Sequence, residues 1–294
     1  MKKIIISVFS LAILFLGGCQ INMSGCSIED IKNIGTFSYK ESETYTEYIN
    51  PVTTGDNILE INVSWIDGEV EFIRGDAFNV TEECISGTYY PLYYRIIDGK
   101  LDIKFVQNGT SSSLINNLKK KITITSPTNL TLIDYNGVSS SLLIDLDEVE
   151  NLDIDNVSGL QKIDLDKANK IDIDNVSGEI NINVSEINIV DIESVSGECS
   201  VKLGKATYID FNTISSNIYL ELFDTSEITK IDLDTTSADI KLALDDVRGY
   251  RLDFSTVSGE KDIEFSDGSD VTLSRYVIDA STISGDITIK RIEK

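Results

Sequence analysis

An aspartate recurs at one position of a repeated sequence pattern, and a row of carboxylates is chemistry that could bind a cation. The pattern is clearest in Leu152–Gly159 and Ile171–Gly178, which read LDIDNVSG and IDIDNVSG. Successive aspartates of the pattern are 19, 19, 19, 19, 22, 21 and 26 residues apart. The eight positions are Asp134, Asp153, Asp172, Asp191, Asp210, Asp232, Asp253 and Asp279.

This aspartate column has two interpretations. Carboxylate oxygens are ligands that Ca²⁺ prefers, and a partial second column at Asp155, Asp174, Glu193 and Asp234 would add further oxygens. Alternatively, the column is a solvated face whose carboxylates accept hydrogen bonds from Ser or Asn side chains at the neighbouring chain corner. If the aspartates stack about 4.8 Å apart, each pair repels by roughly 1 kcal/mol in bulk water. We favour the solvated face and predict no cofactor, with Ca²⁺ as the alternative.

A serine follows each aspartate after five residues, and the next residue is always small. A nucleophilic serine needs a base to activate it, and the chain contains no histidine. We therefore predict that these hydroxyls form a structural ladder at a corner of the chain. The serines are Ser139, Ser158, Ser177, Ser196, Ser215, Ser237, Ser258 and Ser284.

The elements that position these residues follow from the apolar pattern around them. Ile171 and Ile173 flank Asp172, and Ile180 and Ile182 alternate with polar residues after the Ser-Gly corner. Alternation with a period of two is typical of strands that bury one face. Two such strands in a repeat of about 19–22 residues predict an all-β fold, a single-stranded parallel β-helix or β-solenoid. Its core forms when coil stacks on coil.

Three residues depart from the apolar inward positions of this pattern. Gln161 and Lys261 are polar, and a one-residue bulge could turn each of them outward. Cys199 stands where other repeats have isoleucine, which predicts a buried thiol. Cys26 and Cys84 lie too far apart to define a disulfide framework, so whether they are bonded stays open.

The chain before the repeats shows a weaker form of the same pattern. We interpret residues 33–108 as an N-terminal β region or degenerate coils, serving as a β-cap on the exposed edge of the stack. Residues 109–121 are rich in Ser, Asn and Lys and are predicted to be a linker. The repeats then occupy residues 122–294.

The N-terminus has the features of an export signal. Two lysines precede an apolar run from Ile4 to Leu16, which is too short to span a bilayer as a mature helix. The run leads through Leu-Gly-Gly to Cys19, and this sequence resembles the bacterial lipobox. The resemblance implies a lipoprotein signal peptide at 1–18, lipid attachment at Cys19 and a lipidated tether at 19–32. The protein would then face outward from the cell membrane, bound to it through the lipid anchor.

Composition excludes several functions. The chain has 49 acidic and 25 basic side chains and a formal charge of -24, whereas nucleic-acid binding needs a basic face. A catalytic site is a local departure from a repeat, but these acids are the repeat itself, so we predict no enzyme activity. The least favoured alternative is a carbohydrate-active β-helix enzyme, with Arg251 beside Asp253 and Arg275 near Asp279 as its candidate residues.

A family resemblance adds to this interpretation. The run KITITSP from Lys121 to Pro127, followed by the repeated Val-Ser-Gly corners, is similar to the putative-adhesin domain of bacterial envelope proteins, a domain of unknown function. The resemblance covers about residues 55–290 and implies a parallel β-solenoid at the cell surface, without catalytic residues to carry over. We predict a noncatalytic, adhesin-like lipoprotein with a surface interaction or structural role and a protein or cell-wall polymer partner. A calcium-binding adhesin and an envelope-stress signalling partner are the alternatives.

Overall fold

The computed structural model describes residues 36–294, except 56, 128, 246–249, 265–275 and 293–294. The predicted signal peptide, Cys19, the tether, Cys26 and Arg275 lie outside these residues. The described part is all-β with two short helices, Ser42–Thr44 (η2) and Ser112–Ile115 (α2). The predicted all-β class is confirmed. No helix among the described residues has the length and apolar character needed to cross a membrane.

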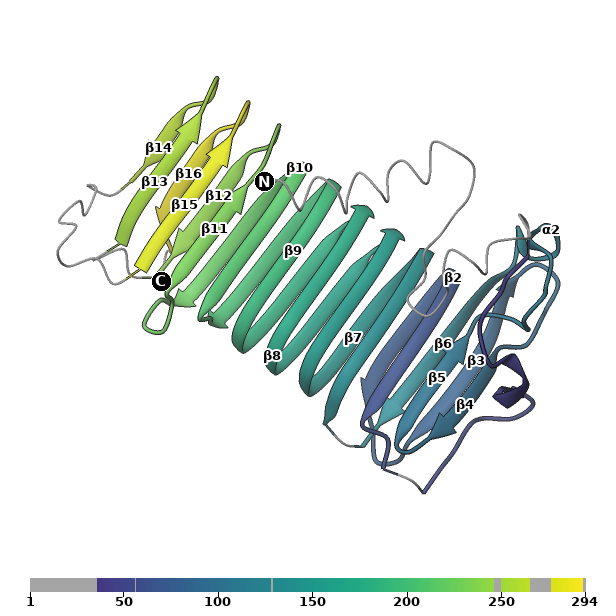
Figure 1. Ribbon diagram of the computed structural model, residues 1–294. Helices are drawn as coiled ribbons and strands as arrows, with labels where there is room; N and C mark the ends of the chain where they lie inside the picture. Colours follow the sequence, from purple (N-terminus) through teal and green to yellow (C-terminus); the bar gives the residue numbers. More distant parts are fainter. Residues whose placement is uncertain (1–35, 56, 128, 246–249, 265–275, 293–294) are drawn as a thin grey trace.

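One sheet of sixteen strands winds through the described residues. Five strands are long because each continues around a corner and supplies both sides of a coil (Figure 1). The strands are β1 Thr46–Glu47, β2 Glu60–Arg74, β3 Asn79–Ser86, β4 Tyr93–Ile97, β5 Lys100–Lys104, β6 Lys119–Ser126, β7 Leu130–Ser158, β8 Gln161–Ser177, β9 Ile180–Lys205, β10 Tyr208–Asp224, β11 Lys230–Asp234, β12 Ile240–Leu244, β13 Tyr250–Thr256, β14 Lys261–Ile263, β15 Tyr276–Thr282 and β16 Ile287–Arg291.

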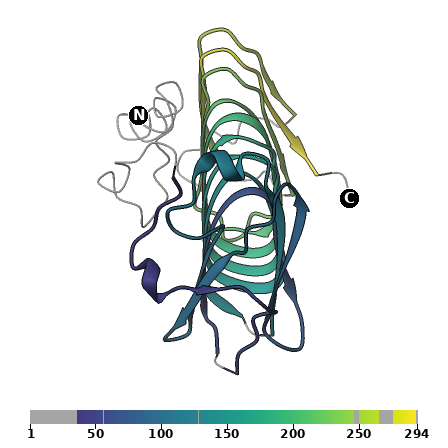
Figure 2. The same cartoon turned by 90° about the vertical axis from the view of Figure 1, so that its right-hand side faces the viewer.

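The middle of the molecule is a stack of parallel coils. β7 pairs with β8, β8 with β9 and β9 with β10, and each pairing brings together residues 19 positions apart. Along each strand, buried and less buried residues alternate, and the buried ones are mostly isoleucine, leucine and valine. Seen along the stack, the coils superimpose as flattened loops around one apolar interior (Figure 2). The solenoid-like architecture follows from this register.

The C-terminal coils do not stack in chain order. β15 lies between β11 and β13, and β16 lies between β12 and β14. The coil of β13 and β14 is therefore outermost, although the coil of β15 and β16 follows it in the sequence (Figure 1). The two coils differ at one inward position, where the outer coil has the exposed Lys261 and its partner on the covered coil is the fully buried Ile287.

At the N-terminal end, too, the order of the strands in the sheet differs from their order in the chain. β5 and β6 form a coil that pairs with one side of β2, and β7 pairs with the other side. β4 then runs antiparallel to β5, and β3 runs antiparallel to β6 (Figure 1). The segment 109–121 contains α2 and the start of β6, so the sheet is continuous across the predicted linker.

The polar residues at inward positions are not turned outward by bulges. Gln161 pairs in register with Leu142 and Ile180, is fully buried, and donates a hydrogen bond from Nε2 to Asn175 Oδ1 at 3.4 Å. Lys261 also pairs in register and is exposed, because it lies on the outermost coil. The predicted bulges are therefore wrong at both positions. Cys199 is buried, as predicted.

Candidate functional site

The eight predicted aspartates form a ladder across the coils. Asp172 pairs with Asp153 and Asp191, and the pairing continues through Asp210 to Asp232. At the far end Asp279 precedes Asp253, because of the exchanged coil order. At the near end Asp134 pairs with Asn62, which in turn pairs with Asp102. Asp102 thus extends the ladder, although it lies outside the sequence repeat.

The acidic charge is densest on three successive coils. Each of these coils carries two carboxylates on the same outer face, because residues two apart in a strand share a face. We call these six residues the acidic patch: Asp153, Asp155, Asp172, Asp174, Asp191 and Glu193. One lysine, Lys170, lies on the same face of these coils and forms an ion pair with Asp172. The patch therefore keeps a large excess of negative charge.

Ladder aspartates bond mainly to residues of their own strand. Asn136 donates to Asp134 at 2.7 Å, and the hydroxyl of Tyr208 donates to Asp210 at 3.0 Å. A lysine forms an ion pair with Asp232 from two residues before it. Asn212 likewise donates to Asp210 at 2.8 Å, so asparagine side chains do donate to the column as expected, but from two residues away in the strand and not from the corner.

Crowding raises the pKa of several patch carboxyls. The pKa of Asp174 rises to about 7, first because neighbouring coils desolvate it and then because Glu193, Asp155, Asp172 and Asp191 are negative. Desolvation and neighbouring aspartates likewise raise the pKa values of Asp155 and Asp191, each to about 6. Part of the patch thus binds protons near neutral pH, where isolated carboxyls are ionised.

The serine column supports the backbone at the corner. Ser158 Oγ donates to the carbonyl of Val138 at 3.1 Å, and Ser177 Oγ donates to that of Val157 at 3.2 Å. Ser196 repeats this bond one coil further on. Each hydroxyl satisfies a carbonyl of the preceding coil, so the predicted structural ladder is confirmed at these positions.

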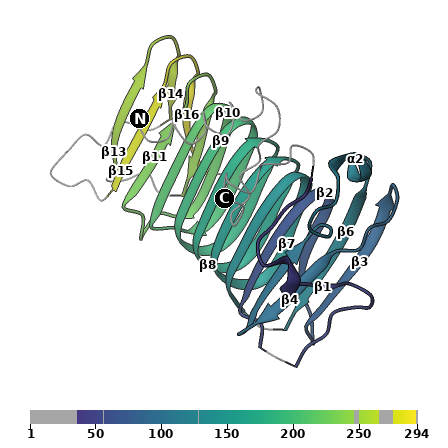
Figure 3. The same cartoon turned by 45° about the vertical axis from the view of Figure 1, so that its right-hand side comes forward.

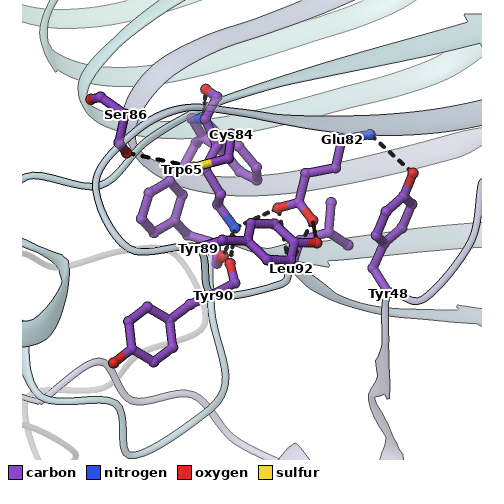
Figure 4. A network of polar contacts seen from close by, with 10 residues as sticks. Tyr48, Trp65, Glu82, Cys84, Ser86, Tyr89, Tyr90 and Leu92 are labelled. Carbon is purple, nitrogen blue, oxygen red and sulfur yellow. Dashed lines mark hydrogen bonds and ion pairs between the residues drawn. The ribbon is translucent and has the colours of Figure 1, made fainter.

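A second polar cluster, buried in the N-terminal region, was not predicted from the sequence. The side chains of Lys120 and Glu82 are both fully buried, and Lys120 Nζ lies 2.6 Å from Glu82 Oε1. Figure 4 shows the surroundings of Glu82. The same ammonium donates to the carbonyl of Tyr90 at 3.0 Å and to that of Phe105. It also lies 5.0 Å from the ring centroid of Trp65 and 4.4 Å from that of Phe105.

The carboxylate of Glu82 also accepts hydrogen bonds from groups other than Lys120. The hydroxyl of Tyr89 donates to Glu82 Oε2 at 2.8 Å, and the backbone N–H of Leu92 donates to both carboxylate oxygens. Burial lowers the pKa of Lys120 to about 8, while the charge of Glu82 opposes this shift. Extending the alternation of Ile122 and Ile124 back by one step would have placed Lys120 inward.

The metal ligands, the arginine–aspartate pair and the thiols considered from the sequence form no further site among the described residues. Within the described ranges, no group of three His, Cys, Asp or Glu side chains is arranged to hold a metal ion, and calcium binding stays an alternative that only experiment tests. Arg251 Nη2 lies 2.9 Å from Asp253 Oδ2 in an exposed ion pair of one strand. Cys84 and Cys199 are free thiols, and burial raises the pKa of Cys199 to about 12.

The structure is thus an all-β, solenoid-like fold with a repeated acidic face. Residues 58–291 match the family described as Toastrack DUF4097, and the chain belongs to that family. The predicted membership in a putative-adhesin domain of unknown function is thereby confirmed. No curated protein sequence matches the chain.

Three solved structures are similar to the chain at low identity. A putative adhesin from Parabacteroides merdae has 12% identity and a TM-score of 0.49, with 85% of this chain and 97% of that chain covered. A protein from Parabacteroides distasonis described as a putative lipid binding protein has 14% identity, a TM-score of 0.45, and coverage of 83% and 97%. A putative adhesin from Bacteroides fragilis has 13% identity, a TM-score of 0.41, and coverage of 84% and 97%.

Proposed function

We propose that the protein is a noncatalytic, adhesin-like lipoprotein of the bacterial cell envelope that presents its acidic face to a basic partner. The observation that carries this proposal is the regular face itself, on which six carboxylates of three coils are accompanied by one lysine. A partner that brings positive charge would relieve the repulsion that the coil spacing imposes. A basic protein or an amine-bearing wall polymer has the required charge.

Anchoring is the second part of the proposal. Cleavage before Cys19 and acylation of its thiol would tether the chain to the outer side of the cell membrane, with residues 19–32 as the tether. The test is metabolic labelling with a radioactive fatty acid in a bacterial host. Label on the wild-type chain and none on Cys19→Ala supports the anchor, and equal labelling of both contradicts it.

The third part of the proposal is that the N-terminal region caps one end of the stack. Coils of 19–22 residues would end in open edges at both ends of the stack, and open edges pair with other chains. The antiparallel strands β3 and β4 cover β6 and β5, so we assign them the role of an N-terminal cap. The buried pair of Lys120 and Glu82 joins β6 to β3 inside this cap.

Binding to isolated envelope material tests the role of the acidic face. The protein used is residues 20–294, which retain every described element. The test variant, Asp155→Asn with Asp174→Asn and Glu193→Gln, removes three charges from the patch. The control variant changes Asp145, Asp164 and Asp166, which are exposed on the second strand of the coils, to Asn.

We expect the patch variant to lose most of its binding to the envelope fraction and the control variant to keep it. Equal binding by both variants would show that the patch is not the contact surface. Because both variants lose the same charge, a general effect of net charge would lower both equally.

A further inference from the structure

The C-terminal end of the stack carries an open sheet edge. β13 pairs with β15 on one side, and β14 pairs with β16. Among the described residues, no strand pairs with the opposite side of β13 or β14, and both lie at the end of the stack in Figures 1 and 3. The other end of the molecule differs, because antiparallel strands cover it.

The exposed strand β13 is complementary to itself. Leu252 pairs in register with the buried Ile278, so it stands at an inner position, whereas Arg251 and Asp253 stand at outer positions. In an antiparallel pair of two β13 strands centred on Leu252, Arg251 of each copy lies directly opposite Asp253 of the other. Directly opposed residues share a face of the sheet, and opposite charges there stabilise the pair.

Other registers are less favourable. Centring the pair on Asp253 would place two aspartates directly opposite each other, which is destabilising. A shift by one residue would place inner positions opposite outer ones and expose the apolar face. Of these registers, the one centred on Leu252 is therefore favoured.

We propose that a second copy of this chain docks on this edge, so that two β13 strands pair antiparallel and the two solenoids meet end to end. Apolar groups of the outer coil gain cover in this arrangement, because Leu252 and Ile263 are only half-buried in a single chain. The ion pair of Arg251 with Asp253 is exposed within one chain and contributes little there. Across the two-fold axis the same residues form a network of four charges.

The end-to-end arrangement has a consequence that rests on the proposed lipid anchor. The first described residue, Thr36, bridges to Ser111 near α2, at the end of the stack opposite to β13 (Figure 1). The two chains of the pair therefore enter the described fold at its two far ends. If each proposed anchor meets the membrane next to its own end, the pair joins two opposed membranes, which is adhesion between like cells.

Sedimentation velocity with residues 20–294 tests the docking, independently of the anchor and of the acidic patch. The concentration series extends above about 100 μM, because small interfaces bind weakly. We expect a monomer–dimer equilibrium for the wild type. Arg251→Asp and Asp253→Arg should each weaken dimerisation by about tenfold or more, because each places four like charges at the axis.

Mixing the two variants provides the matched control. One variant carries only negative and the other only positive charge at these two positions, so an equimolar mixture should form a heterodimer with close to wild-type affinity. Arg74→Asp, which removes an exposed ion pair on β2, should leave dimerisation unchanged.

Three results would overturn the inference. The first is a wild-type chain that stays monomeric throughout the series, as it would if residues 265–275 of the same chain occupied the edge. The second is a dimer that neither charge reversal weakens. The third is a mixture of the two variants that stays monomeric although the wild type dimerises. None of these results affects the test of the acidic patch against envelope material.

Discussion

Replacing Asp174 by Asn should stabilise the protein at neutral and alkaline pH. The change removes one charge from the centre of the acidic patch and keeps the shape of the side chain. The pKa of Asp174 is raised from about 3.8 to about 7, which corresponds to about 4 kcal/mol that its ionised form costs the fold. Because the side chain is only partly buried and solvent screens its neighbours, we expect a gain of about 1–2 kcal/mol in unfolding free energy at pH 8.

The pH dependence follows from the sign of the shift. A carboxyl whose pKa is higher in the folded than in the unfolded state makes the folded protein bind more protons, so stability falls as pH rises through this window. The raised pKa values of Asp155, Asp174 and Asp191 place the window between about pH 4 and 7. The advantage of Asp174→Asn should therefore be largest above pH 7 and fade toward pH 4.

Urea unfolding at pH 5 and pH 8 measures the effect. The control is Asp166→Asn, which removes one exposed charge from the other strand of the same coil region and should change stability by less than about 0.5 kcal/mol. A patch variant no more stable than wild type at pH 8, or a gain that is larger at pH 5, would refute the electrostatic reasoning.

Three further predictions concern other parts of the molecule. Calcium should raise the melting temperature no more than magnesium at matched ionic strength; a saturable, calcium-selective rise would instead show that the aspartate columns bind this ion. Lys120→Met should lower the unfolding free energy by about 3–5 kcal/mol, because it leaves Glu82 buried without a counter-charge, and adding Glu82→Gln should restore part of the loss; a loss below 1 kcal/mol in denaturant would contradict this assignment. Gly159→Ala should cost about 2 kcal/mol or more, because Gly159 has a φ of +126° and a Cβ would lie 2.3 Å from the carbonyl oxygen of Ser140; an unchanged urea midpoint would show that the corner adapts.

The stacked middle of the fold was predictable from the sequence because identical residues face one another. The register Asp153–Asp172–Asp191 follows directly from a repeat of 19, and the serine hydroxyls occupy the corners that the small residues after them indicate. In this region local pattern and tertiary contact contain the same information.

The two ends were not predictable in the same way. The spacing of the aspartates does not say whether the coil of Asp279 stacks before or after the coil of Asp253, and only the pairing of β15 with both β11 and β13 reveals the order. The buried pair of Lys120 and Glu82 joins residues that carry no repeat signal, so only the antiparallel packing of β3 on β6 reveals it. Gln161 stays inward because its strand keeps the register with Leu142 and Ile180, and Asn175 accepts one hydrogen bond from it inside the core.

Site-specific photocrosslinking in living bacteria tests the central claim, that the acidic face is the surface that meets a partner, most directly. A photoreactive amino acid placed at Asp155, on the patch, is compared with one at Asp166, on the second strand of the coils. We predict that the probe at Asp155 crosslinks to a basic protein or a wall polymer and that the probe at Asp166 does not. Equal crosslinking from both positions, or none from Asp155 in a chain that is folded and exported, would contradict the claim.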